Sequence, residues 1–305
     1  MKLTIATRGS ALALWQANHI KDLLESHHIG LEVKLNVIKT IGDKILDVPL
    51  AKIGGKGLFV KEIETALMEN EADLAVHSMK DVPTELPASL ELYANPKKEL
   101  PNDAFLSVKY SSLEEMKAGD SVGTSSLRRK LQLNKLVSGL NIKDLRGNVD
   151  TRIRKMAEGE YDAIILAAAG LKRLGLTEHV RQLIPVESMI PAVCQGVLGL
   201  ELRRDDARTK ELISFLKDPE TETTVAAERA FLKKLEGGCQ APIACHAVLA
   251  DSKLSLTGYL ADLDGRRVIK LYHQGSASLA KELGEELAEN VLASGGYEIL
   301  KEIYI

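Results

Sequence analysis

Apolar and polar residues alternate with two different periods along the first 80 residues of the chain. Short runs in which every second residue is apolar are typical of half-buried strands, and longer runs with apolar residues three or four apart are typical of amphipathic helices. Such runs follow one another over 2–8, 10–26, 31–40, 57–70 and 72–79. The order strand, helix, strand, helix, strand predicts a parallel sheet covered by helices.

A second set of the same kind follows residues 93–103, a segment rich in proline, asparagine and charge that is typical of a linker. Its segments are expected to run strand, helix, strand, helix, strand, helix, strand. They cover 104–109, 112–119, 121–125, 125–139, 141–146, 149–159 and 161–170. The first two thirds of the chain therefore predict two similar α/β units in series.

The last third of the chain has a different pattern. Helical periodicity over 202–218 and 220–237 is followed by three strand-like runs between 245 and 275, and then by one long amphipathic helix at the end. We expect two α/β domains and a small α+β domain. The expected boundaries are 1–95 with 196–216 for the first domain, 96–195 for the second and 217–305 for the third.

Composition narrows the class of protein. Of the 305 residues, 45% are hydrophobic and 27% are charged, which provides substantial cores and excludes intrinsic disorder. The longest apolar run is about half of the roughly 20 residues that cross a bilayer. Arg8 lies where a secretory signal would need its apolar segment, so we expect a cytoplasmic protein with no membrane contact. Three cysteines, none in a C-x-x-C pair, indicate neither a disulfide framework nor a metal site.

Charge is distributed unevenly along the chain. The net charge is −3 and aromatic residues make up 4% of the sequence, which speaks against a nucleic-acid partner. Between residues 123 and 154, however, eight lysines and arginines stand against two acidic residues. This basic stretch is either a solvated surface or part of a site for an anionic ligand.

Within the basic stretch, GTSSLRR places small residues and two arginines where a strand passes into a helix. Free backbone N–H groups, the hydroxyls of Ser125 and Ser126, and the guanidinium groups of Arg128 and Arg129 can all face one anion there. The alternative is an ordinary serine cap followed by exposed arginines.

Two further junctions repeat this arrangement. In LRGNVDTRIR, Arg146 ends a strand and Arg152 falls early in the next helix, and TRGS supplies Arg8 and Ser10 at the first strand-to-helix turn. Arginine forms bidentate hydrogen bonds with carboxylates and phosphates. Several such junctions at sheet edges predict a ligand with several anionic groups, bound between the two α/β units.

Three other motifs carry candidate chemistry. AKIGGKG is not an ATP-binding P-loop, so it is either a flexible loop that brings Lys52 and Lys56 over an anion or a surface turn. In VHSMKDVP, Asp81 follows a strand, where it is either a turn cap or a catalytic carboxylate that stabilises a cation or moves protons.

In LEGGCQAPIAC, Cys239 follows two glycines. It is either an inert apolar residue or an accessible cysteine that serves as a nucleophile or an attachment point.

Taken together, these segments closely resemble the porphobilinogen deaminase family, also called hydroxymethylbilane synthases. The matching motifs occur in the family's order and cover nearly the whole chain. They are TRGSALALWQ, AKIGGKGLFVKE, VHSMKDVPT, GTSSLRR, LRGNVDTR, AAAGLKRLG, PAVCQGVLG and LEGGCQAPI. The resemblance implies an enzyme of tetrapyrrole biosynthesis that condenses four porphobilinogen molecules head to tail, releases ammonia and yields linear hydroxymethylbilane.

The resemblance also implies roles for single residues. Cys239 would carry a dipyrromethane cofactor through a thioether, Asp81 would be the catalytic carboxylate, and Lys52 and Lys56 would lie in a mobile loop. The residues that would hold the carboxylates of cofactor and substrate are Arg8, Ser10, Lys80, Ser126, Arg128, Arg129, Arg146, Arg152 and Arg173. The first two domains would be similar to periplasmic binding proteins. We expect a monomer with a small-molecule substrate, without a metal.

This chemistry fits the residues, because each porphobilinogen carries an acetate and a propionate that arginines can bind. Loss of ammonia would leave an azafulvenium-type cation, which Asp81 could stabilise. The alternative is a non-catalytic, two-lobed binding protein for a small polyanion. That alternative explains the arginines but gives no role to Asp81 or Cys239.

Overall fold

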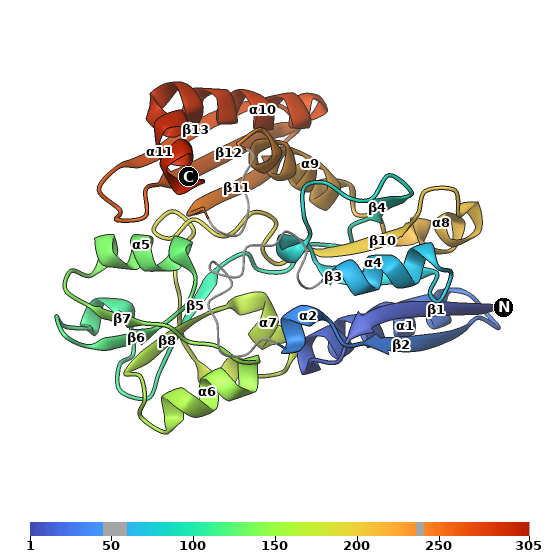
Figure 1. Ribbon diagram of the computed structural model, residues 1–305, viewed down its shortest axis with the longest axis horizontal. Helices are drawn as coiled ribbons and strands as arrows, with labels where there is room; N and C mark the ends of the chain where they lie inside the picture. The colour runs from blue at the N-terminus through green and yellow to red at the C-terminus, as the bar shows by residue number, and fades with distance from the viewer. Residues whose placement is uncertain (45–59, 236–240, 305) are drawn as a thin grey trace. The chain divides into compact units, whose positions relative to one another are not determined.

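The computed structural model describes residues 1–44, 60–235 and 241–304 (Figure 1). The described residues form two compact units. The first unit contains 1–44, 60–99 and 196–222, and the second contains 100–195 and the described part of 223–304. Within the described residues, the backbone passes from one unit to the other between residues 99 and 100, between 195 and 196, and between 222 and 223.

The first unit is built on a mixed sheet with the strand order β2-β1-β3-β10-β4. Strand β1 runs parallel to β2 and β3, as the sequence pattern predicts, whereas β10 runs antiparallel to both β3 and β4. The strands are β1 (Lys2–Arg8), β2 (Glu32–Ile38), β3 (Leu74–Ser78), β4 (Leu90–Ala94) and β10 (Leu198–Arg203).

Helix α1 (Ala11–His27) covers this sheet because its apolar residues recur at helical spacing. Ala17, Ile20 and Leu24 are fully buried in one core with residues of β1 and β3. The helix begins at Ser10, whose hydroxyl accepts a hydrogen bond from the backbone amide of Ala13 at 3.3 Å. The other helices of this unit are α2 (Ile41–Lys44), α4 (Lys61–Met68) and α8 (Ala207–Ile213).

The second unit contains another five-stranded mixed sheet, with the order β7-β6-β8-β5-β9. Strand β6 runs parallel to β7 and β8, and β5 runs antiparallel to β8 and β9. The strands are β5 (Asp103–Ser107), β6 (Ser121–Gly123), β7 (Asn141–Lys143), β8 (Ala163–Ala167) and β9 (Val180–Leu183). The helices that accompany them are α5 (Leu127–Leu136), α6 (Val149–Ala157) and α7 (Ala168–Arg173).

The second unit also contains an antiparallel sheet of three strands, in the order β11-β12-β13. The ring of Phe231 lies in the part of helix α9 (Pro219–Lys234) that belongs to this unit. It packs directly on β12 (Lys253–Ala261), where a Cβ at Gly258 would lie 2.8 Å from the ring. The strands are β11 (Ile243–Ala250), β12 (Lys253–Ala261) and β13 (Val268–Ser276), and the helices are α9 (Pro219–Lys234), α10 (Ala280–Val291) and α11 (Tyr297–Ile303). The expected fold class, two α/β domains plus a small α+β domain, is confirmed.

Three expected helices were wrong in extent. Residues 112–119 form only a 3₁₀ turn at Leu113–Glu115, because side-chain hydrogen bonds to the backbone hold this short segment on both sides of the turn. The helix expected over 202–218 begins at Ala207, after Asp206 caps the amide of Thr209. Its first two expected residues, Leu202 and Arg203, belong to β10.

The helix expected at the end of the chain is interrupted between α10 and α11. Gly295 has a φ of +98°, which side chains other than hydrogen rarely permit, and a Cβ at Gly296 would lie 2.6 Å from the carbonyl oxygen of Val291. The two adjacent glycines therefore allow a break that the apolar periodicity does not reveal. No described helix has the length and apolar character needed to span a bilayer. The boundaries of the three expected domains stay a prediction.

Candidate active site

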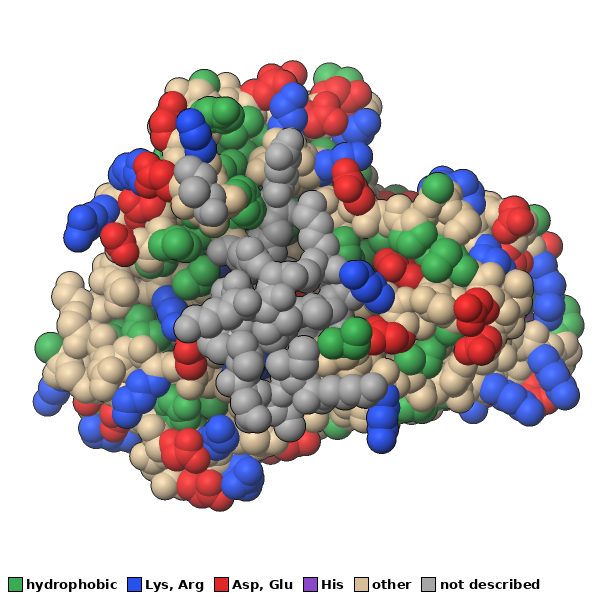
Figure 2. Space-filling model, viewed as in Figure 1, with side chains coloured by type: hydrophobic (Ala, Val, Ile, Leu, Met, Phe, Trp, Pro, Cys, Tyr) green, Lys and Arg blue, Asp and Glu red, His purple; other side chains and the backbone are tan. Residues whose placement is uncertain are grey.

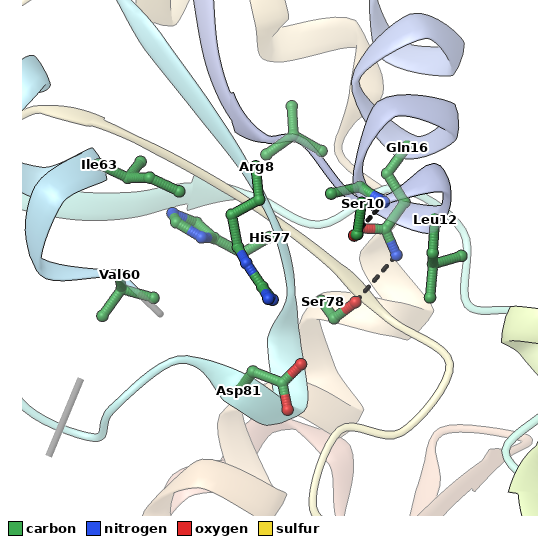
Figure 3. Close-up of a pocket in the computed structure, with 11 residues that line it drawn as sticks. Arg8, Ser10, Leu12, Gln16, Val60, Ile63, His77, Ser78 and Asp81 are labelled. Carbon is green, nitrogen blue, oxygen red and sulfur yellow. Dashed lines mark hydrogen bonds between the residues drawn. The ribbon is translucent and has the colours of Figure 1, made fainter. Parts of the chain in front are cut away.

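A pocket of about 90 Å³ opens at the carboxyl end of β1 and β3 in the first unit (Figure 3). Arg8 is the last residue of β1, and Asp81 ends the 3₁₀ turn Met79–Asp81 that follows β3. Because β1 and β3 are parallel neighbours, their carboxyl ends lie at the same edge of the sheet. This topology explains why Arg8, Ser10, His77 and Asp81, which are far apart in sequence, line one pocket.

Asp81 is the exposed acidic residue of this pocket. Its carboxylate accepts no hydrogen bond from any described residue and forms no ion pair with one. Figure 3 shows this carboxylate and the guanidinium group of Arg8 directed into the same pocket from two different segments. A carboxylate in this state can bind the N–H groups or the positive charge of a ligand.

Hydrogen bonds fix part of the wall of this pocket. Gln16 is buried, and its Nε2 donates to the hydroxyl of Ser78 at 2.9 Å (Figure 3). Ser10 accepts its bond from α1, so its oxygen is already oriented by the helix cap. Lys80 is half-buried within the turn that holds Asp81, but it does not line this pocket.

A buried pair of ionisable residues lies at the back of the same pocket. His77 Nε2 lies 2.8 Å from Glu201 Oε2, and Glu201 has no exposed surface. Burial, with a contribution from the charge of Glu201, raises the pKa of the nearby Glu64, while His77 acts in the opposite direction. Sequence reasoning missed this pair, because Glu201 belongs to a strand that was expected to be helical or connecting chain.

The two arginines of GTSSLRR are buried in the second unit and share one carboxylate. Arg128 Nη1 donates to Asp103 Oδ2 at 2.8 Å, and Arg129 donates from Nε and Nη2 to Asp103 Oδ1 at 3.0 and 2.7 Å. Burial alone would raise the pKa of Asp103, but the charges and hydrogen bonds of the arginines hold it far below its usual range. The alternative of exposed arginines is therefore wrong.

The serines of the same junction have structural partners. Ser126 is the N-cap of α5 and accepts a hydrogen bond from the amide of Arg129 at 3.4 Å. The Ser125 hydroxyl donates to the carbonyl of Leu145 at 2.9 Å and accepts from the amide of the same residue at 3.1 Å. The bonds of Ser125 connect the residues before α5 to the segment that contains Leu145 and Arg146.

Arg146 differs from the other arginines of the basic stretch. It is half-buried after β7 and makes no hydrogen bond or ion pair with any described residue. Arg152 in α6 donates from Nε to the carbonyl of Gly147 at 2.7 Å, so the two arginines flank one turn. Arg173 is half-buried at the end of α7.

The basic stretch as a whole does not form a continuous positive surface. Lys130 pairs with Asp144 at 2.7 Å and Arg154 pairs with Glu158 at 2.9 Å, in addition to the two buried pairs on Asp103. On the face drawn in Figure 2, acidic and basic side chains are interspersed. Of the other basic residues in this stretch, Arg146 and Arg152 are half-buried, whereas Lys135 and Lys143 are exposed.

Three candidate residues, Lys52, Lys56 and Cys239, lie outside the described residues. The other two cysteines are described and fully buried. Cys245 lies within β11 with no exposed surface, and Cys194 is 1% exposed. Burial in apolar surroundings disfavours the thiolate form that a nucleophile needs.

Comparisons with solved structures give weak likenesses to binding proteins. The methionine-binding protein MetQ covers 70% of this chain and 88% of its own at 13% identity, with a TM-score of 0.45. The periplasmic aliphatic sulphonate binding protein SsuA from Escherichia coli covers 77% and 70% at 13% identity, with a TM-score of 0.41. Sequence identities and TM-scores this low do not indicate what this chain binds.

Sequence comparisons are far more specific. Residues 3–211 match the family model "Porphobilinogen deaminase, dipyromethane cofactor binding domain", and residues 222–293 match "Porphobilinogen deaminase, C-terminal domain". Porphobilinogen deaminases from Maridesulfovibrio salexigens and Geobacter sulfurreducens are 54% and 53% identical to this chain, each over 99% of it. The alignments cover 98% and 95% of those two relatives. The chain therefore belongs to the porphobilinogen deaminase family.

Proposed function

We propose that this chain condenses four porphobilinogen molecules into linear hydroxymethylbilane, with release of ammonia, in tetrapyrrole biosynthesis. The observation that carries the proposal is the carboxylate of Asp81, which faces a pocket shared with Arg8 and has no partner among the described residues. A protein that only binds polyanions gains nothing from a carboxylate there. A catalyst that generates a cation from an anionic substrate needs both groups.

Asp81 acts on the reacting pyrrole in this proposal. When the carbon–nitrogen bond of the aminomethyl group breaks, the electron pair leaves with ammonia and the pyrrole becomes cationic. The carboxylate of Asp81 stabilises that positive charge. Joining two pyrroles then releases a proton from a ring carbon, and in this proposal Asp81 accepts it.

Basic and hydroxyl side chains hold the acetate and propionate groups. Arg146 has all its N–H donors available among the described residues, and Arg128 and Arg129 keep some of theirs. This donor set fits a ligand with several carboxylates, such as a dipyrromethane. The full proposed set is Arg8, Ser10, Lys80, Ser126, Arg128, Arg129, Arg146, Arg152 and Arg173. Lys52 and Lys56, which lie outside the described residues, are proposed as residues of a mobile loop.

Cys239 is proposed as the residue that carries the dipyrromethane through a thioether. When bound, this cofactor supplies the primer to which pyrroles are added. The burial of Cys194 and Cys245 supports the assignment, because a buried thiol is hard to reach and hard to ionise. We also propose a cytoplasmic monomer with three domains, over 1–95 with 196–216, 96–195 and 217–305.

Arg146→Lys is expected to raise the KM for porphobilinogen about tenfold, because lysine keeps the charge but loses the bidentate geometry. The melting temperature should not change, since Arg146 makes no hydrogen bond or ion pair with described residues. Arg154→Lys is the matched control, because Arg154 is exposed and pairs only with Glu158 four residues away. An unchanged KM in Arg146→Lys would remove this arginine from the binding site.

The function itself is tested by incubating the purified chain with porphobilinogen. Consumption of four porphobilinogen molecules and one water molecule, with four ammonia molecules and one hydroxymethylbilane formed, is the expected result. Saturable binding of porphobilinogen without release of ammonia would instead support the polyanion-binding protein.

A further inference from the structure

The environment of Asp103 contains more positive than negative charge. Asp103 has no exposed surface, and Arg128 and Arg129 are 6% and 7% exposed. Among the described residues, Asp103 is the carboxylate that pairs with both guanidinium groups, and neither arginine has a second acidic partner. The neighbouring Tyr259 adds no negative charge at neutral pH, because burial raises its pKa to about 12.

Both arginines also keep unused hydrogen-bond donors. Each guanidinium group has five N–H donors. Arg128 uses two, both on Nη1, toward Asp103 and the carbonyl of Ile190, whereas Arg129 uses three, toward Asp103 and the carbonyl of Ile165. The Nε and Nη2 groups of Arg128 have no partner within the part of the chain that the structure describes.

Asp103 is itself held in place from two sides. It is the first residue of β5, and its Oδ1 accepts a hydrogen bond from Gln195 Nε2 at 3.0 Å. The same nitrogen donates to the carbonyl of Pro101 at 2.6 Å. Asp103 is therefore a fixed anchor, and the planes of the two guanidinium groups follow from its position.

We propose that Asp103 is a positioning residue of the ligand site, which orients Arg128 and Arg129 and neutralises one of their two charges. The remaining positive charge and the unused donors serve one carboxylate of the bound pyrrole chain. This inference rests on the function proposed above. It predicts that the contributions of the cofactor and of Asp103 to protein stability depend on each other, because each supplies negative charge to the same two cations.

Asp103→Asn tests the coupling, since asparagine keeps the shape but removes the charge. The melting temperature is measured in the full-length protein as purified and in the Cys239→Ala background, which should lack cofactor. Without cofactor, Asp103→Asn leaves two buried cations with no counter-charge, so it should lower the melting temperature by roughly 5 °C more than in the cofactor-bound protein.

Asp162→Asn is the matched control. Asp162 adjoins the opposite end of the β5–β8 pair, where it binds Ser121 and Lys109. This substitution should lower the melting temperature equally in both backgrounds. Equal shifts for Asp103→Asn as well would show that Asp103 is only a structural ion-pair partner, and would overturn the inference.

A double variant covers the case in which Asp103→Asn does not fold without cofactor. Asp103→Asn with Arg129→Gln removes one charge of each sign and restores the original excess. It should melt within a few degrees of the Cys239→Ala parent, yet carry less covalent cofactor by intact mass when Cys239 is present. A double variant as unstable as the single one would contradict the charge argument. A wild-type protein without any covalent cofactor would instead overturn the proposed function, and this inference with it.

Discussion

Replacement of Asp81 by asparagine is expected to slow porphobilinogen turnover by about 100- to 10,000-fold, the range that loss of acid–base assistance produces. Asparagine has nearly the same shape but can neither accept a proton nor balance a cation. Folding should be unaffected, because Asp81 is exposed and its carboxylate makes no hydrogen bond with described residues. Steady-state kinetics and melting temperature of the purified variant check both statements.

Glu85→Gln is the matched control for this substitution. Glu85 is another exposed carboxylate on the segment after β3, but it does not line the pocket. Its variant should retain wild-type kcat and KM. Activity of Asp81→Asn within a few-fold of wild type would exclude Asp81 from the chemical steps.

Replacement of Cys239 by alanine is expected to abolish turnover and the covalent cofactor together. Covalent attachment keeps the primer in the site through successive additions, and this advantage is lost entirely without the attachment point. The protein should still fold, because the buried cores of all three sheets are built from other residues. Intact mass, circular dichroism and a porphobilinogen assay measure the three properties.

Cys245→Ala and Cys194→Ala serve as controls for the attachment site. Both cysteines are buried, so each alanine leaves a small cavity and a modest loss of stability. Both variants should still carry the cofactor and turn over substrate. Full activity in Cys239→Ala, or loss of cofactor only in Cys245→Ala, would refute the assignment.

The sequence predicted those parts of the fold that depend on local pattern. Strands β1, β2 and β3 and helix α1 follow directly from the alternation of apolar residues and from the cap at Ser10. The antiparallel strand β10 was missed, because a strand that returns to a sheet from 100 residues away pairs through tertiary contacts that no local pattern encodes. The break at Gly295 was missed because apolar periodicity continues across it.

Those residues of the candidate site that follow directly after predicted parallel strands could be predicted from the sequence. Arg8, Ser10 and Asp81 line one pocket because parallel strands end at one edge of a sheet. The partners of the arginines were not predictable. Asp103 lies 25 residues before Arg128, at the end of the segment 93–103 that the sequence pattern predicts to be a linker. Only the folded sheet brings the two residues together. His77 and Glu201 pair across 124 residues for the same reason.

The central claim is that pyrroles are assembled on a cofactor covalently bound to Cys239. Intact mass of the purified wild-type chain, followed by peptide mapping, tests it most directly. We predict a mass above the 33.3 kDa of the polypeptide, a further stepwise increase on brief exposure to porphobilinogen, and a modified peptide that contains Cys239. An active protein with the unmodified polypeptide mass, or with the added mass on the Cys245 peptide, would contradict the account.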